Sequence, residues 1–174
     1  KVPFTRELYI DAADFAEVPP PKFFRMKEGG EVRLMGAYLV KCNEVVKHAD
    51  GTLAELRCTA DLETGNGNPA DGRKVKGTIH WLSAPHAIDL TLHLYNNLMT
   101  LENPSDKPED KEFSDFINPD SLVVETGAKG EPALADAKPG DKFQFVRFGY
   151  FCLDTKHPRT FNRAVGLKDS FPKA

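Results

Sequence analysis

Glycine and proline interrupt this chain at short intervals, which limits the length of any helix or strand that it can form. The 174 residues include 13 Gly and 13 Pro, and both residue types tend to end regular elements. Between these breaks, apolar and polar residues alternate with a period of two, which is the repeat of a strand. The pattern predicts an all-β protein whose short strands, at hairpin spacing, build one or two small antiparallel β-barrels with one or two short helices.

The same alternation places individual strands. Residues 32–42 are expected to form one long strand whose even-numbered positions make a mainly apolar face. The pair Asp50-Gly51 predicts a turn before a return strand over 53–60. Residues 63–72 are interpreted as a wide hairpin loop, and a short helix is expected to begin at Ser114. Further strands are expected over 74–82, 88–95, 121–125 and 142–153, and 98–112 is interpreted as an exposed connector or hairpin tip.

The charge of the chain is small but unevenly distributed. There are 23 Lys and Arg against 26 Asp and Glu, a net charge of −3, which at first argues against a nucleic-acid binder because such domains are usually basic. Basic residues outnumber acidic ones by six to three over 22–47, by three to one over 71–86 and by seven to two over 138–168, whereas 98–126 holds eight acidic and two basic residues. If the three basic segments meet in the fold, they form a positive surface that the net charge conceals.

Aromatic side chains lie among these basic residues. Phe23 and Phe24 precede Arg25, and five aromatic residues over 143–151 surround Gln144 and Arg147. Proteins hold unstacked RNA bases with aromatic rings, Arg planes and amide groups. The alternative is that most of these aromatic residues are barrel core. Spacing alone therefore favours RNA binding only weakly.

No metal-binding or catalytic motif stands out. The three cysteines, Cys42, Cys58 and Cys152, are 16 and 94 residues apart, and neither a Cys-x-x-Cys nor a His-x-x-x-His motif occurs. The Gly-rich loop 64–68 lacks the Gly-Lys-Ser/Thr ending of a phosphate-binding loop. We therefore expect no metal and no catalytic residue in this chain. A cysteine or metal enzyme is the rival hypothesis, and it would need the cysteines and histidines to converge in space.

The compartment is also constrained. An odd, small number of cysteines is typical of a reducing compartment. No apolar run approaches eighteen residues, and the N-terminus has no apolar signal-peptide core. The sequence predicts a soluble cytoplasmic protein with no membrane partner.

Specific motifs narrow the choice much further. The run Asp-Gly-Arg-Lys-Val-Lys-Gly-Thr-Ile-His-Trp at 71–81, followed by Ser83-Ala84 and His86-Ala87, resembles the C-terminal anticodon-binding region of glutaminyl-tRNA synthetases, a family of class I aminoacyl-tRNA synthetases. The stretches that agree in the same order lie at 9–15, 31–38, 117–123, 143–154 and 161–169. The resemblance thus covers roughly residues 2–171.

The resemblance implies a fold and a function for the chain. The fold would be two small antiparallel β-barrels similar to that of the 5S-rRNA-binding ribosomal protein, with approximately 1–20 plus 98–174 in a proximal barrel and 21–97 in a distal one. The anticodon loop of tRNA(Gln) would be held across both. The parent enzyme would be a monomeric ligase that attaches glutamine to tRNA(Gln) with ATP and Mg²⁺. This chain shows no His-Ile-Gly-His or Lys-Met-Ser-Lys-Ser type motif, so it is interpreted as an excised domain, beginning at Lys1, that needs no cofactor and is inactive without the catalytic domain.

Five residues match the family positions that contact the anticodon. Arg33 is similar to the Arg at the first base and its phosphate. Arg25, with Lys22 nearby, matches the segment that reads the third base, and Gln144 and Arg147 match residues at the middle uracil. Arg can pair with a phosphate and a base acceptor together, and Gln offers both a donor and an acceptor to a base edge.

Two departures and two rival families remain. Bacterial members tend to carry Lys and Arg where this chain has Phe24 and Met35, so the resemblance does not carry over one charged contact to each outer base. The closest rival is the homologous domain of a eukaryotic- or archaeal-type glutamyl-tRNA synthetase, against which Gln144 and the aromatic segment argue. The other is a ribosomal-type protein binding 5S rRNA, for which a single barrel is expected.

Overall fold

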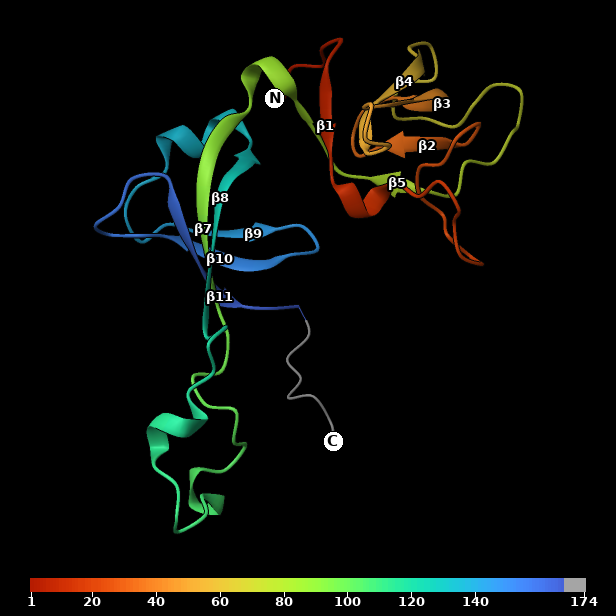
Figure 1. Ribbon diagram of the computed structural model, residues 1–174. Helices are drawn as coiled ribbons and strands as arrows, with labels where there is room; N and C mark the ends of the chain where they lie inside the picture. The colour runs from red at the N-terminus through yellow and green to blue at the C-terminus, as the bar shows by residue number, and fades with distance from the viewer. Residues whose placement is uncertain (168–174) are drawn as a thin grey trace. The chain divides into compact units, whose positions relative to one another are not determined.

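The computed structural model describes residues 1–167, whose regular elements are mainly β-strands (Figure 1). The chain divides into two compact units between Pro85 and His86. The helical segments in the described part of the chain are all short 3-10 turns. None of them has the length and apolar character that a membrane crossing requires. The expected all-β class is confirmed.

The first unit contains a four-stranded sheet and a separate strand pair. The sheet has the order β4-β3-β2-β5, and β1 pairs with β6. Its core is formed by apolar side chains of these strands together with Met26. The elements are β1 (Leu8–Ile10), η1 (Ala12–Asp14), β2 (Glu31–Leu34), β3 (Leu39–Lys47), β4 (Leu53–Asp61), β5 (Thr78–Ile79), β6 (Trp81–Ser83) and η2 (Ala84–His86).

The expected long strand over 32–42 is wrong, because a turn divides it into β2 and β3. Gly36 adopts φ +68 there, a conformation that glycine accepts without strain, and the backbone N–H of Leu34 donates to the carbonyl of Tyr38 at 2.9 Å. The even-numbered positions Val32 and Val40 are nevertheless buried, as the alternation predicts. The alternation of apolar and polar residues therefore identified the buried face, but not the turn that reverses the chain between β2 and β3.

The interpretation of 63–72 as a hairpin loop is also wrong. The segment leaves β4 at one edge of the sheet and leads to β5, which lies at the other edge and pairs in parallel with β2. The loop therefore crosses from edge to edge. The hairpin between β3 and β4 at Asp50-Gly51 is confirmed.

The second unit is a five-stranded sheet of order β8-β7-β11-β10-β9, antiparallel except for the parallel pair of β7 and β11. Its buried core consists of Leu90, Phe151, Leu153 and Phe161. The elements are β7 (Ile88–Tyr95), η3 (Pro104–Asp106), η4 (Phe113–Phe116), β8 (Leu122–Gly130), η5 (Pro132–Asp136), β9 (Lys142–Phe145), β10 (Gly149–Leu153) and β11 (Thr160–Val165).

Sequence expectations for this unit are mostly confirmed. Residues 88–95 form β7, and 98–112 lies in the long tip of the β7–β8 hairpin, which extends away from the sheet as the green segment in Figure 1. The expected helix near Ser114 is the single turn η4. Residues 142–153 are not one strand but the hairpin of β9 and β10.

The barrel architecture stays a prediction. The three sheets formed by residues 1–167 are open, with no closed barrel among them. The compact units follow chain order, whereas the resemblance implies exchange of 1–20 and of 86–97 between barrels. The last part of the expected proximal barrel, 168–174, lies outside the described residues, as does Asp169 of the final matching stretch.

Candidate nucleic-acid interface

The five predicted contact residues fall on both units. Lys22, Arg25 and Arg33 belong to the first unit, and Gln144 and Arg147 to the second. All except the half-buried Arg33 are exposed. The structure therefore offers two local sites, each of which can be described by itself.

In the first unit, Gly77 joins the segment of Arg25 to the strand of Arg33. The carbonyl of Gly77 accepts a hydrogen bond from the backbone N–H of Arg33 at 2.8 Å. On its other side, a Cβ added to Gly77 would lie 2.1 Å from the carbonyl oxygen of Phe24. Only glycine allows this approach. The residue next to Arg25 and the strand that carries Arg33 are therefore neighbours.

The Arg25 side chain is held against a short 3-10 turn. Its Nη1 donates to the carbonyl of Ala13 at 2.9 Å, and its Nε lies 3.3 Å from Oδ1 of Asp14. The guanidinium also lies 5.9 Å from the centre of the Phe23 ring, within cation–π range. Two nitrogens of the Arg25 guanidinium, Nε and Nη1, are thus engaged by the protein, while 41% of the side chain stays exposed.

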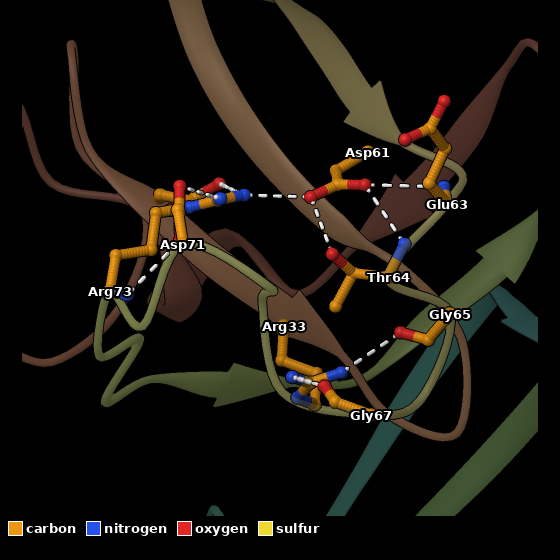
Figure 2. A network of polar contacts seen from close by, with 9 residues as sticks. Arg33, Asp61, Glu63, Thr64, Gly65, Gly67, Asp71 and Arg73 are labelled. Atoms are coloured by element: carbon orange, nitrogen blue, oxygen red, sulfur yellow. Dashed lines mark hydrogen bonds and ion pairs between the residues drawn. The ribbon is translucent and has the colours of Figure 1, made fainter.

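Arg33 is engaged by the loop that crosses the sheet. Its Nη1 donates to the carbonyl of Gly65 at 3.0 Å and its Nη2 to the carbonyl of Gly67 at 2.5 Å. Figure 2 shows the guanidinium of Arg33 reaching into the curve of this loop. Neutral carbonyls leave the positive charge of Arg33 uncompensated, so an anion remains a favourable partner.

Arg73, by contrast, is neutralised by three carboxylates. Its guanidinium nitrogens lie 3.0 Å from Glu31, 2.7 Å from Asp61 and 2.5 Å from Asp71 (Figure 2). These hydrogen bonds, first with Glu31, raise the pKa of Arg73 above its ordinary value. The basic segments 22–47 and 71–86 therefore meet in this unit, but Arg73 stabilises the loop and adds no free positive charge.

Lys22 and Phe24 flank Arg25 differently. Lys22 is exposed in a turn with φ 65. The Phe24 ring is 52% exposed, and Nζ of Lys76 lies 5.4 Å from its centre. Lys76 thus places a cation beside Phe24. In the sequence, only its place in the basic segment 71–86 indicated that Lys76 could contact RNA. The fold shows that Lys76 approaches Phe24.

In the second unit, Gln144 and Arg147 share the β9–β10 hairpin. Gln144 pairs directly with Tyr150 across the two strands, and Phe145 pairs with Gly149 to close the turn. Arg147 occupies the turn with φ 70, in the left-handed region. Both side chains are exposed.

The aromatic residues of this hairpin divide between core and surface. Phe145 stacks on Phe151 at 4.5 Å, and Phe143 packs edge-on against Phe161 at 5.7 Å. Phe148 and Tyr150 are instead 54% and 49% exposed. Because paired residues project to the same face, Tyr150 lies beside Gln144. Sequence alternation within 142–153 could have separated these sets only if the turn at 146–148 had been recognised.

No metal or cysteine centre competes with these sites. In residues 1–167, no group of three or more His, Cys, Asp or Glu side chains could hold a metal ion. Cys42 and Cys58 face each other across β3 and β4, whereas Cys152 lies in β10. Desolvation raises the pKa of the Cys58 thiol to about 12, with a further increase from Cys42. A thiol that stays protonated is a poor nucleophile.

Comparison with known proteins identifies the family. Residues 1–61 and 78–154 match two family models that share the description "tRNA synthetases class I (E and Q), anti-codon binding domain". The chain is similar to the glutamine–tRNA ligase of Stutzerimonas stutzeri, with 49% identity over 98% of this chain and 31% of the ligase. The ligases of Rhodopirellula baltica and Pseudomonas syringae are 49% and 46% identical, over 99% and 98% of this chain and 29% and 31% of theirs.

This chain therefore spans about a third of the length of the relatives that it matches. The family models match segments of both compact units, and every predicted contact residue lies within a matched segment. The chain belongs to the family of anticodon-binding domains of the class I tRNA synthetases for glutamate and glutamine.

Proposed function

We propose that this chain is the anticodon-binding part of a glutamine–tRNA ligase. The observation that carries the proposal is 49% identity with such ligases over nearly the whole chain. The rest of the parent polypeptide would attach glutamine to tRNA(Gln) with ATP and Mg²⁺. This chain would select the tRNA and catalyse nothing without that part.

In this proposal each base of the anticodon has its own contacts. Arg33 binds the first base and its phosphate, Gln144 and Arg147 bind the middle uracil, and Arg25 with Lys22 binds the third base. The exposure of Arg25, Gln144 and Arg147 supports these roles, as does the uncompensated charge of Arg33. Lys76, beside Phe24, joins the contacts to the third base.

The finer architecture and setting are part of the same proposal. The chain would form two small β-barrels, approximately 1–20 plus 98–174 and 21–97. The parent enzyme would act as a monomer, and its location would be the cytoplasm. The homologous domain of a glutamyl-tRNA synthetase is the alternative, because the family description covers both amino acids. The genetic code separates the two: glutamine codons begin with C and glutamate codons with G, so the third anticodon base is guanine in tRNA(Gln) and cytosine in tRNA(Glu).

The proposal is tested with two synthetic RNA hairpins, one with the anticodon CUG and one with CUC. Fluorescence anisotropy should show tighter binding of the CUG hairpin. Arg33→Ala and Arg147→Ala should each weaken that binding about tenfold, the effect expected for one charge-assisted contact. Arg57→Ala is the matched control, because Arg57 on β4 pairs with Glu44 of β3 and Glu55 of β4 and is not a proposed RNA contact.

Unchanged affinity of both variants, with folding confirmed by circular dichroism, would contradict the assigned contact residues. Preference for the CUC hairpin would instead support the glutamyl alternative.

A further inference from the structure

Asp14 is the one charged side chain that is fully buried within residues 1–167, with 0% of its surface exposed. A buried carboxylate is costly unless a cation and hydrogen-bond donors compensate it. Arg25, whose Nε lies 3.3 Å from Asp14, is a partner of this kind. Arg25, which we propose to bind the third anticodon base, is thus held in place by the fully buried Asp14.

The backbone around Asp14 is fixed as firmly as its side chain. Asp11 caps the turn η1 by accepting from the backbone N–H of Ala13 at 2.8 Å. The backbone N–H of Met26 donates to the carbonyl of Asp14 at 2.8 Å, and the N–H of Ala16 donates to the carbonyl of Met26 at 3.2 Å. The residue that follows Arg25 is therefore joined on both sides to the segment that holds Asp14.

These contacts use two of the three guanidinium nitrogens of Arg25. Nε and Nη1 are turned toward Asp14 and the carbonyl of Ala13. Nη2 contacts no acceptor within the described part of the chain. The guanidinium keeps N–H groups that these two contacts do not use, and the N–H donors of Arg fit the O6 and N7 acceptors of guanine. Cytosine offers an amino donor instead, which Arg cannot accept.

We infer that Asp14 is a positioning residue that fixes Arg25 for recognition of guanine at the third anticodon base. It thereby contributes to the choice between glutamine and glutamate tRNAs. This inference rests on the proposed function of Arg25. Without Asp14, the long Arg side chain would have to lose its rotamer freedom when the RNA binds, and it would no longer favour one base edge.

The test is a double-mutant cycle on the whole chain with the CUG and CUC hairpins as probes. Asp14→Asn keeps the shape of the side chain and removes its charge. It should weaken binding of the CUG hairpin about tenfold, the equivalent of ordering one long side chain, and leave CUC binding unchanged. Added to Arg25→Ala, Asp14→Asn should cause no further loss. Glu17→Gln is the control, since Glu17 forms an exposed ion pair with Lys47 at 2.6 Å.

The outcomes separate this inference from the function beneath it. If Arg25→Ala leaves CUG binding unchanged, the proposed role of Arg25 fails. If Arg25→Ala weakens binding but Asp14→Asn does not, the positioning role of Asp14 is overturned. The role is also overturned if Asp14→Asn weakens the binding of both hairpins equally and still does so in the Arg25→Ala background.

A second measurement needs no variant at position 14 and decides the case if Asp14→Asn does not fold. In the unmodified protein, the NMR signal of the Arg25 Nε–H should exchange with water more slowly than that of Arg57, whose contacts lie on an exposed strand surface. Equal exchange rates would show that Asp14 does not hold Arg25 in solution, and the inference would be wrong.

Discussion

At the scale of single residues, two proposed RNA contacts are already bonded to the protein before RNA arrives. Arg33 donates to carbonyls of the crossing loop, and Arg25 to a carbonyl and a carboxylate. An anticodon base or phosphate must compete with these acceptors or bind the edge that they leave open. The protein contacts thus restrict where each guanidinium can point, and this orientation is a basis for specificity as much as for affinity.

Arg147 differs, because its backbone is strained. Its φ of 70 is a conformation that costs a non-glycine residue about 1 kcal/mol. Arg147→Gly and Arg147→Ala both remove the guanidinium, but only glycine accepts this conformation freely. We expect the Gly variant to be about 1 kcal/mol more stable to urea than the Ala variant.

Both variants should show the same loss of RNA affinity, since they lack the same side chain. A Gly variant that binds better than the Ala variant would show that hairpin order, and not the guanidinium, governs binding at this position.

At the scale of elements, the crossing loop between β4 and β5 depends on ionised Asp61. The carboxylate accepts from the backbone N–H of Thr64 at 3.0 Å and from its hydroxyl at 2.7 Å, and it pairs with Arg73. These hydrogen bonds, those of Thr64 first, lower the pKa of Asp61 to about 2. Since the folded pKa lies below the unfolded one, this stabilisation is present above about pH 4 and is lost as the pH falls toward 2.

Asp61→Asn should therefore reduce the free energy of unfolding at pH 6, and the difference from the unmodified protein should shrink between pH 4 and 2. Urea unfolding at several pH values measures this. Glu63→Gln, which removes a neighbouring charge, should show a smaller and flatter difference. A constant difference for Asp61→Asn across this range would mean that ionisation of Asp61 does not stabilise the loop.

The elements also show how far the sequence determines the fold. Alternation correctly placed β7 and the buried residues Val32 and Val40, because burial of one face imposes period two. It could not reveal that 32–42 and 142–153 each fold back, since a tight turn requires only a few permissive residues, such as Gly36.

Sequence motifs were enough to select the candidate contact residues, but not to predict their contacts within the protein. Motifs indicated Arg25, Arg33 and Gln144 as contact residues. The partner of Arg25, Asp14, and those of Arg33, Gly65 and Gly67, lie in other segments of the chain, and no local pattern connects them. The contact between Lys76 and Phe24 also depends on the placement of β5 beside β2.

At the scale of the whole molecule, the net charge of −3 has to be reconciled with RNA binding. In the first unit, Lys and Arg equal Asp and Glu in number, and the excess of acidic residues lies in the second unit. Some of the basic side chains are also neutralised by carboxylates of the protein, as Arg73 is. We therefore expect binding to depend on individual cations at the proposed contact points and not on the overall charge.

This leads to a prediction about salt. Each phosphate neutralised on single-stranded RNA contributes about −0.7 to the slope of log affinity against log salt concentration. The five proposed cations, Lys22, Arg25, Arg33, Lys76 and Arg147, should thus give a slope whose magnitude is at most about 3.5. Arg33→Ala should reduce this magnitude by about 0.7, because Arg33 is assigned to a phosphate.

Gln144→Ala should weaken binding and leave the slope unchanged, because an amide releases no counterion. Anisotropy titrations of the CUG hairpin from low to high KCl measure both effects. A slope far steeper than about −3.5, unaltered in Arg33→Ala, would show that the RNA is held by a diffuse basic surface instead of by these residues.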